Sequence, residues 1–325
     1  MQSLVARIHP SIRCALMGWF LTRSILWLLN DQLYHQREPL LATGSPLPGL
    51  VAIATETLAG LFSQGPWVVA IEAMPWIIVE VMILWAGIEV YRFARSTELP
   101  QVSERACWIW FLNPLLAYHF MDWGSQIAAA SGALALALLL RRRPLVAAMM
   151  AVIAVGCRLE FILLWPAVLG ASWRIYGTKG EKLRGLLLGW MTIPAAFAVW
   201  IGATWHLAGM AEISLRALHG DAQWRHLSGM HLSLPGEAIL YLALTGCLLL
   251  VIHGLRRYPL WYSLAAIPVI AWPLIQTPAY GAALSLAWAL PLTIYIAHTC
   301  EDQSVHRSVL GALFFAYFLV AMISP

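Results

Sequence analysis

Residues 107–173 read CWIWFLNPLLAYHFMDWGSQIAAASGALALALLLRRRPLVAAMMAVIAVGCRLEFILLWPAVLGASW, and this stretch decides the fold class. Its apolar runs approach the length that crosses a bilayer, about 20 residues. The same stretch carries Asn113-Pro114, Asp122, Gln126 and the Arg158-Leu159-Glu160 triplet. Polar and ionisable groups in hydrocarbon are costly, so each of them is a functional-site hypothesis. The stretch therefore predicts membrane helices that enclose a polar site.

The composition of the whole chain agrees with this interpretation. Of its 325 residues, 61% are hydrophobic and 11% are charged, whereas soluble domains carry about 25% charged residues. The sequence therefore predicts an all-α, polytopic transmembrane helical bundle, with residues 1–325 as a single transmembrane domain. The net charge of +4 does not indicate a nucleic-acid partner, because the basic residues lie between the apolar runs.

The apolar runs predict about eleven membrane segments, several of which are short or broken. Residues 144–157 and 159–172 are expected to form one hairpin of short helices that has Arg158 near its apex. The segments are 14–30, 66–91, 106–121, 125–140, 144–157, 159–172, 185–207, 236–255, 259–276, 282–298 and 308–323.

Basic residues predict the orientation of these segments. With the N-terminus in the cytoplasm, fifteen Lys and Arg residues fall in cytoplasmic segments and three fall outside. This asymmetry is typical of multi-pass membrane proteins. We therefore expect a multi-pass protein of the cytoplasmic (inner) membrane with its N-terminus inside and its C-terminus outside. The first apolar run lacks a small-residue cleavage site, so it is interpreted as a retained span.

Two long outer loops hold most of the remaining polar residues. They are residues 31–65, in which 50–62 could lie as an interfacial helix, and residues 208–235. Chemistry is therefore expected on the outer face. The five cysteines form no CxxC pair, and they are interpreted as packing residues rather than as disulfides or zinc ligands.

Asp31 opens the first outer loop at the end of the first predicted span. An acid there can serve as a general base that takes the proton of an acceptor hydroxyl. The alternative is an interfacial acid that marks the helix end. Arg23 lies eight residues earlier, on the same helix face, and its guanidinium suits a phosphate or carboxylate. A structural ion pair with a membrane acid such as Glu80 is the alternative for Arg23.

The central stretch holds the other candidates. Asp122 and Gln126 lie in and just after a turn that can dip into a cavity, and helix capping is the alternative for Asp122. Arg158 can bind a lipid-linked phosphate, and Glu160 can orient it or contact a sugar hydroxyl. Salt bridging is the alternative for both residues.

The second outer loop contains Arg225 and His226, which can offer a positive surface to phosphate, unless the loop is simply solvated. Its histidine spacing fits no familiar metal motif, so no metal ligands are assigned. The sequence requires no cofactor and leaves a divalent metal ion open.

The order of motifs in the central stretch resembles the membrane-embedded GT-C superfamily of glycosyltransferases. Within it, the pattern is similar to the mannosyltransferases of GPI-anchor assembly and their bacterial relatives. The resemblance covers about 70 residues, and Asp31-x-x-Tyr34 is similar to the first outer loop of that family. The matching residues are Asn113-Pro114, Asp122 to Gln126, Arg141 to Pro144, Arg158-Leu159-Glu160 and Trp165-Pro166.

The resemblance implies an inverting glycosyltransferase with Asp31 as the catalytic base. Tyr34 and His35 follow Asp31 in the first outer loop and are expected near the substrate. It implies transfer of a hexose such as mannose from a polyprenyl-phosphate donor to a lipid-linked or glycan acceptor, in contact with membrane lipids. Two alternatives remain from other classes. One is a transporter of lipid-linked sugars or small solutes, and the other is a non-catalytic subunit of a polysaccharide assembly system.

Overall fold

The computed structural model describes fifteen stretches of the chain, and structural statements below refer to these residues. The stretches are 9–29, 46–61, 66–97, 100–113, 123–141, 143–157, 159–165, 168–170, 173, 178–183, 187, 193–196, 198–199, 202 and 303–323. Within them the regular structure is helical and no strand occurs, which confirms the all-α prediction.

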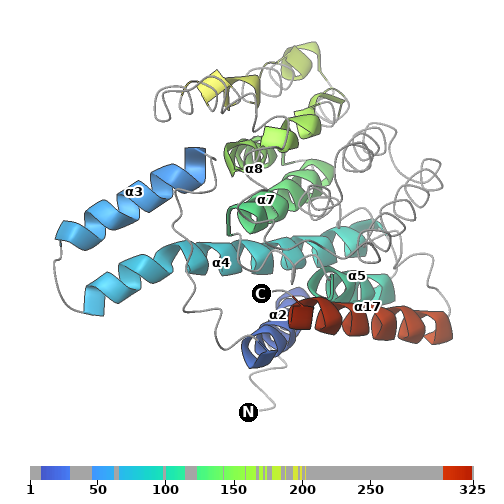
Figure 1. The fold of residues 1–325 in the computed structure, drawn as a ribbon. Helices are drawn as coiled ribbons and strands as arrows, with labels where there is room; N and C mark the ends of the chain where they lie inside the picture. Colours follow the sequence, from blue (N-terminus) through green and yellow to red (C-terminus); the bar gives the residue numbers. More distant parts are fainter. Residues whose placement is uncertain are drawn as a thin grey trace, which may run out of the picture.

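Seven α-helices and one 3₁₀ helix make up the longer described elements (Figure 1). Several begin at a proline, which favours the first helical position because it has no N–H to leave unpaired there. The elements are α2 (Pro10–Leu29), α3 (Pro46–Leu61), α4 (Pro66–Thr97), α5 (Pro100–Phe111), α7 (Trp123–Leu140), α8 (Pro144–Cys157), the 3₁₀ helix η3 (Leu159–Leu164) and α17 (Gln303–Ile323).

The long helix α4 lies between two groups of helices (Figure 1). Helices α2 and α5 pack on one side of it, and α17 packs against both of them. Helix α7 packs on the other side of α4 and carries α8 behind it, while α3 contacts α4 and α8. Side chains on α4 therefore have different neighbours depending on the direction in which they point.

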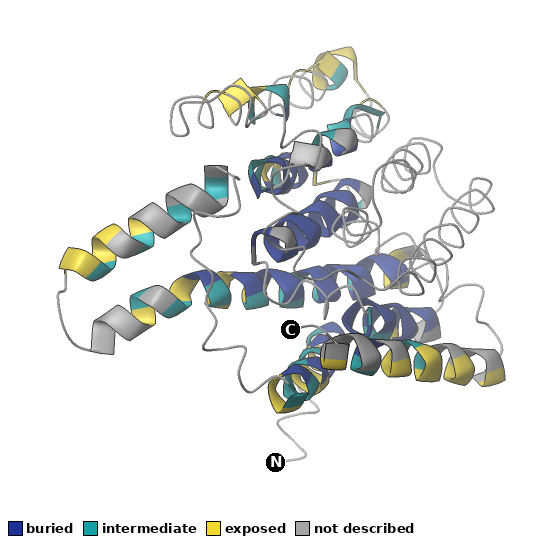
Figure 2. Ribbon diagram, viewed as in Figure 1, coloured by how far each residue is buried: buried dark blue, intermediate teal, exposed yellow. Residues whose placement is uncertain are grey.

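Helix α7 forms the centre of the core. Every residue from Gln126 to Leu139 is buried, and Figure 2 shows the helix in dark blue over almost its whole length. Its sequence is rich in Ala, Gly and Ser, and small side chains let neighbouring helices approach closely. A helix that is apolar all round is expected to be enclosed in this way.

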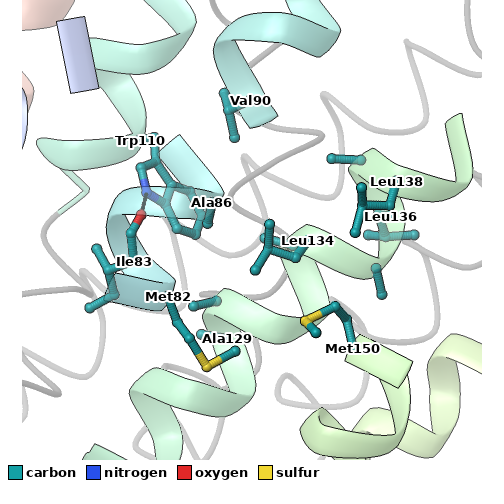
Figure 3. Close-up of a cluster of buried hydrophobic side chains, with 14 of the residues drawn as sticks. Met82, Ile83, Ala86, Val90, Trp110, Ala129, Leu134, Leu136, Leu138 and Met150 are labelled. Atoms are coloured by element: carbon teal, nitrogen blue, oxygen red, sulfur yellow. Dashed lines mark hydrogen bonds between the residues drawn. The ribbon is translucent and has the colours of Figure 1, made fainter. Parts of the chain in front are cut away.

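Aromatic side chains of α5 fill the space beside α4. The Trp110 indole N–H donates to the Ile83 carbonyl oxygen at 3.3 Å, beside Ala86 (Figure 3). The Phe111 ring lies between two glycines, because a Cβ added at Gly18 or Gly87 would come within 2.6 Å or 2.5 Å of a ring carbon. These glycines allow α2, α4 and α5 to close around one aromatic ring.

Two described helical segments are long and apolar enough to cross a membrane, Pro10–Leu29 and Ala73–Ser96. Large apolar side chains are also exposed on the outside of the fold. They include Met17, Phe20, Trp27 and Leu28 on α2, Met74, Ile77 and Val81 on α4, Leu145 and Met149 on α8, and Phe314, Phe315 and Met322 on α17. Contact of such faces with hydrocarbon carries no hydrophobic free-energy cost, whereas their contact with water does.

The predicted segments match the described helices unevenly. The predicted segment 144–157 coincides with α8, and residues 50–61 of the interfacial segment lie in helix α3. The predicted segment 106–121 is not one unbroken helix, since α5 ends at Phe111. The residue before a proline is disfavoured in the α conformation, and Asn113 precedes Pro114. The eleven-segment bundle stays a prediction, because residues 203–302 lie outside the described part.

Candidate functional site

Three of the residues predicted for the site fall within the described part of the chain. They are Arg23 on α2, Gln126 on α7 and Glu160 in η3, of which Glu160 is described for its backbone alone. The other candidates lie outside the described residues: Asp31, Tyr34, His35, Asp122, Arg158, Arg225 and His226. Their roles stay predictions.

Arg23 and Glu80 form an ion pair between α2 and α4. The Arg23 Nε–H donates to Glu80 Oε2 at 2.8 Å, and the Trp19 indole N–H donates to the same oxygen at 2.6 Å. The side chains of Arg23 and Glu80 are only 13% and 25% exposed. Because an isolated charge in apolar surroundings is costly, each of the two charges requires the other.

Helix α17 completes this cluster from the far end of the chain. The buried Tyr317 hydroxyl donates to the Thr22 carbonyl oxygen at 3.3 Å. The five residues Trp19, Thr22, Arg23, Glu80 and Tyr317 are called the Arg23 cluster below.

The Arg23 cluster joins three helices around a pair of charges that neutralise each other. The alternative that the sequence left open for Arg23, an ion pair with Glu80, is therefore confirmed. The arrangement fixes α2 to α4 and α17 around Thr22 and Arg23, six to seven residues before the helix ends at Leu29. Asp31 follows two residues after that helix end in the sequence.

A second ionic cluster was missed by the sequence interpretation. Glu89 on α4 is 2% exposed, and its two carboxylate oxygens accept from Arg92 at 3.0 Å and from Arg141. Glu89, Arg92 and Arg141 are called the Glu89 cluster below. The available signal was an acid inside the apolar run ILWAGIEVYRFA, which is the same signal that marked Glu80.

The two acids of α4 serve opposite sides of that helix. They are nine residues apart, which corresponds to about 13 Å along the axis and two and a half turns. The extra half turn directs Glu80 toward α2 and Glu89 toward the end of α7, in agreement with their partners. Helix α4 is thus held by one ion pair to each of its two helix groups.

Gln126 lies in a different place from Arg23. It is buried near the start of α7, on the side of α4 opposite to α2. Gln126 is also remote from the Glu89 cluster, because it lies fifteen residues before Arg141, or about 22 Å along α7. The structure does not bring Arg23 and Gln126 together, so a site that uses both must extend around α4.

Metal ligands and reactive thiols are not gathered anywhere in the described helices. Within the searched stretches, no group of three His, Cys, Asp or Glu residues could hold a metal ion. Cys14, Cys107 and Cys157 are buried and form no disulfide, in agreement with the packing role predicted for cysteines at these three positions. Metal independence of the whole chain stays a prediction.

Comparisons of this chain with protein families, curated proteins and solved structures found no significant match.

Proposed function

We propose that this chain is a multi-pass protein of the inner membrane that transfers a hexose such as mannose on the outer face. The donor is a polyprenyl-phosphate sugar, and the acceptor is a lipid-linked sugar or a glycan. The proposal combines three supports: the apolar surface of the described helices, the ionic clusters within apolar segments, and the sequence resemblance to GT-C glycosyltransferases.

The membrane part of the proposal is supported by what covers the outside of the helices. Exposed Phe20, Trp27, Ile77 and Phe315 would face water in a soluble protein, at a cost for each side chain. Lipid removes that cost. Of the other predicted segments, 125–140, 144–157 and 308–323 fall on the described helices α7, α8 and α17, and the three between residues 203 and 302 lie outside the described part.

The observation that carries the functional proposal is the Arg23 cluster. A partly buried ion pair fixes α2 to α4, and the Tyr317 hydroxyl bonds to the same turn of α2, eight to nine residues before Asp31 in the sequence. A general base must be held at hydrogen-bond distance from the hydroxyl that it deprotonates, so it benefits from a rigid support. A loop acid without a catalytic or binding role would need no such support.

In the proposed reaction, the oxygen of the acceptor hydroxyl attacks the anomeric carbon of the donor sugar, and Asp31 takes the proton of that hydroxyl. The bond from that carbon to the phosphate oxygen breaks, and the lipid phosphate leaves with the electron pair. Arg158 stabilises the charge on the leaving phosphate, assisted by Arg225 and His226, because cationic groups lower the energy of a developing anion in a dry site. Arg23 acts as a positioning residue, since Glu80 already balances its charge.

The remaining candidates contact the sugars in this scheme. Asp122, Gln126 and Glu160 hydrogen-bond to hydroxyl groups, while Tyr34 and His35 line the approach beside Asp31. No step of the reaction requires a metal ion or another cofactor.

A second candidate function is a transporter of lipid-linked sugars or a non-catalytic assembly subunit. The separation of Arg23 and Gln126 by α4 favours this candidate, because a transporter uses polar groups distributed along a path. Such a protein would keep both ionic clusters and would need no base.

The test is sugar transfer in proteoliposomes that contain the purified chain and a polyprenyl-phosphate mannose donor. We expect Asp31→Asn to abolish transfer, with Glu38→Gln as a control acid from the same loop that retains it. Unchanged transfer in Asp31→Asn would show that another group is the base. Movement of the donor across the bilayer without any transfer would establish the transporter instead. Recovery of the wild-type chain outside the membrane fraction would contradict both.

A further inference from the structure

The Glu89 cluster places two guanidinium groups on one carboxylate. Arg92 bonds to Oε1 and Arg141 bonds to Oε2, so the two cations lie next to each other although they are 49 residues apart in the chain. The cluster carries one net positive charge. Arg92 and Arg141 are 38% and 26% exposed, whereas Glu89 is 2% exposed, so the cations face outward and the acid faces the core.

More basic side chains surround this cluster at the same end of the fold. Arg95 lies one turn beyond Arg92 on α4, and Arg143 follows Arg141 in the turn before α8, and both are exposed. Glu104 is the exposed acid described at this end, and its backbone carbonyl lies beside Cys14 of α2. Among the described residues, the balance of charge at this end is therefore positive.

Exposed apolar side chains follow the cations along the chain, beginning four residues after Arg141 and two after Arg143. Leu145 is 58% exposed in the first turn of α8, and Met149 is 56% exposed one turn later. Residues four apart lie on the same face of a helix, so the two form a strip that runs along α8 away from Arg141 and Arg143. A cationic group at the head of an exposed apolar strip matches an amphiphile with an anionic head.

We propose that Arg92 and Arg141, held together by Glu89, bind the phosphate of an anionic phospholipid whose acyl chain lies along Leu145 and Met149. Guanidinium groups bind phosphate oxygens through pairs of N–H donors, and this gives them a geometric preference for phosphate. Glu89 acts as the positioning residue because it fixes both guanidinium groups from the buried side. The inference rests on the membrane placement proposed above, and it is independent of sugar transfer.

The experiment is native mass spectrometry of the full chain, purified in a non-ionic detergent and titrated with phosphatidylglycerol or phosphatidylcholine. We expect the wild type to prefer phosphatidylglycerol. Arg92→Gln should weaken phosphatidylglycerol binding about fivefold, since each basic residue near an anionic surface contributes a factor of about this size. This variant keeps the Glu89–Arg141 pair, so it is the one best able to fold.

Arg13→Gln is the matched control, because Arg13 is exposed on α2 and has the same charge but no described contact with Glu89. If Arg13→Gln and Arg92→Gln lose phosphatidylglycerol affinity equally, the lipid is attracted to the positive charge of this end in general, and the proposed site is overturned. Equal binding of the two lipids by the wild type would also overturn it. Displacement of phosphatidylglycerol by inorganic phosphate at the same concentration would assign the cations to free phosphate. None of these results depends on sugar transfer or on recovery of the chain in the membrane fraction. Failure of the lipid-binding inference can therefore be distinguished from failure of the proposed function.

Discussion

The ion pair between Arg23 and Glu80 allows the role of a predicted site residue to be tested by a double-mutant cycle. The perturbations are Arg23→Gln, Glu80→Gln and the two together. Each single change removes one charge and leaves the other in largely apolar surroundings, with side chains that are 13% and 25% exposed. The double change leaves two neutral amides that can hydrogen-bond to each other.

The magnitudes follow from burial and from the shared hydrogen bonds. Breaking a fully buried pair costs about 3–5 kcal/mol, and the partial exposure here reduces this to about 2 kcal/mol for each single variant. In the Arg23→Gln variant, the Glu80 carboxylate keeps the Trp19 indole N–H as a donor. The double variant should lose only about 1 kcal/mol, because no unpaired charge remains. Simple additivity would give about 4 kcal/mol, so the expected coupling is about 3 kcal/mol.

The assay is equilibrium unfolding of the purified protein in mixed micelles with increasing sodium dodecyl sulfate, followed by tryptophan fluorescence. Arg13→Gln is the control, since it removes an exposed charge from the same helix and should leave the unfolding midpoint unchanged. The reasoning is refuted if the double variant loses as much stability as the two single variants combined.

Two further predictions concern packing in the described core. Gly87→Ala should destabilise the fold by about 1–3 kcal/mol in the same assay, because its Cβ would meet the Phe111 ring. Gly311→Ala in α17 meets no atom within 4 Å and should be neutral or stabilising; equal effects of the two changes would contradict the packing described here. The three buried cysteines should resist a maleimide reagent while the chain is folded and react in dodecyl sulfate, once the other two cysteines are replaced by serine. Their rapid labelling in the folded protein would disprove burial.

Part of the fold could be predicted because local patterns decide it. Prolines and apolar runs mark where helices start and how long they are, and α8 occupies the residues predicted for it, 144–157. Helix α5 was misjudged, since the apolar run continues through Asn113-Pro114 while the helix ends at Phe111. Hydropathy indicates whether a side chain prefers apolar surroundings, and it does not show where a helix ends. The backbone restriction before a proline decides where this helix stops.

The partners of charged residues could be predicted far less well. Glu80 was named as one possible partner of Arg23, but spacing along the chain could not choose between a carboxylate and a phosphate. Glu89 and Arg141 are 52 residues apart, and their contact depends on how α7 packs against α4. Periodicity within one helix holds no information about which neighbour a given face will meet.

The sequence by itself determined that this chain is helical and apolar, and where its charged residues interrupt the apolar runs. These properties follow from composition and from short-range rules of backbone geometry. Only the tertiary structure decided that Arg23 is neutralised by Glu80 and that Glu89 unites Arg92 with Arg141. A buried charge must find its counter-charge in three dimensions, and the helix packing that provides it is set by the shapes of many side chains together, such as Phe111 between Gly18 and Gly87.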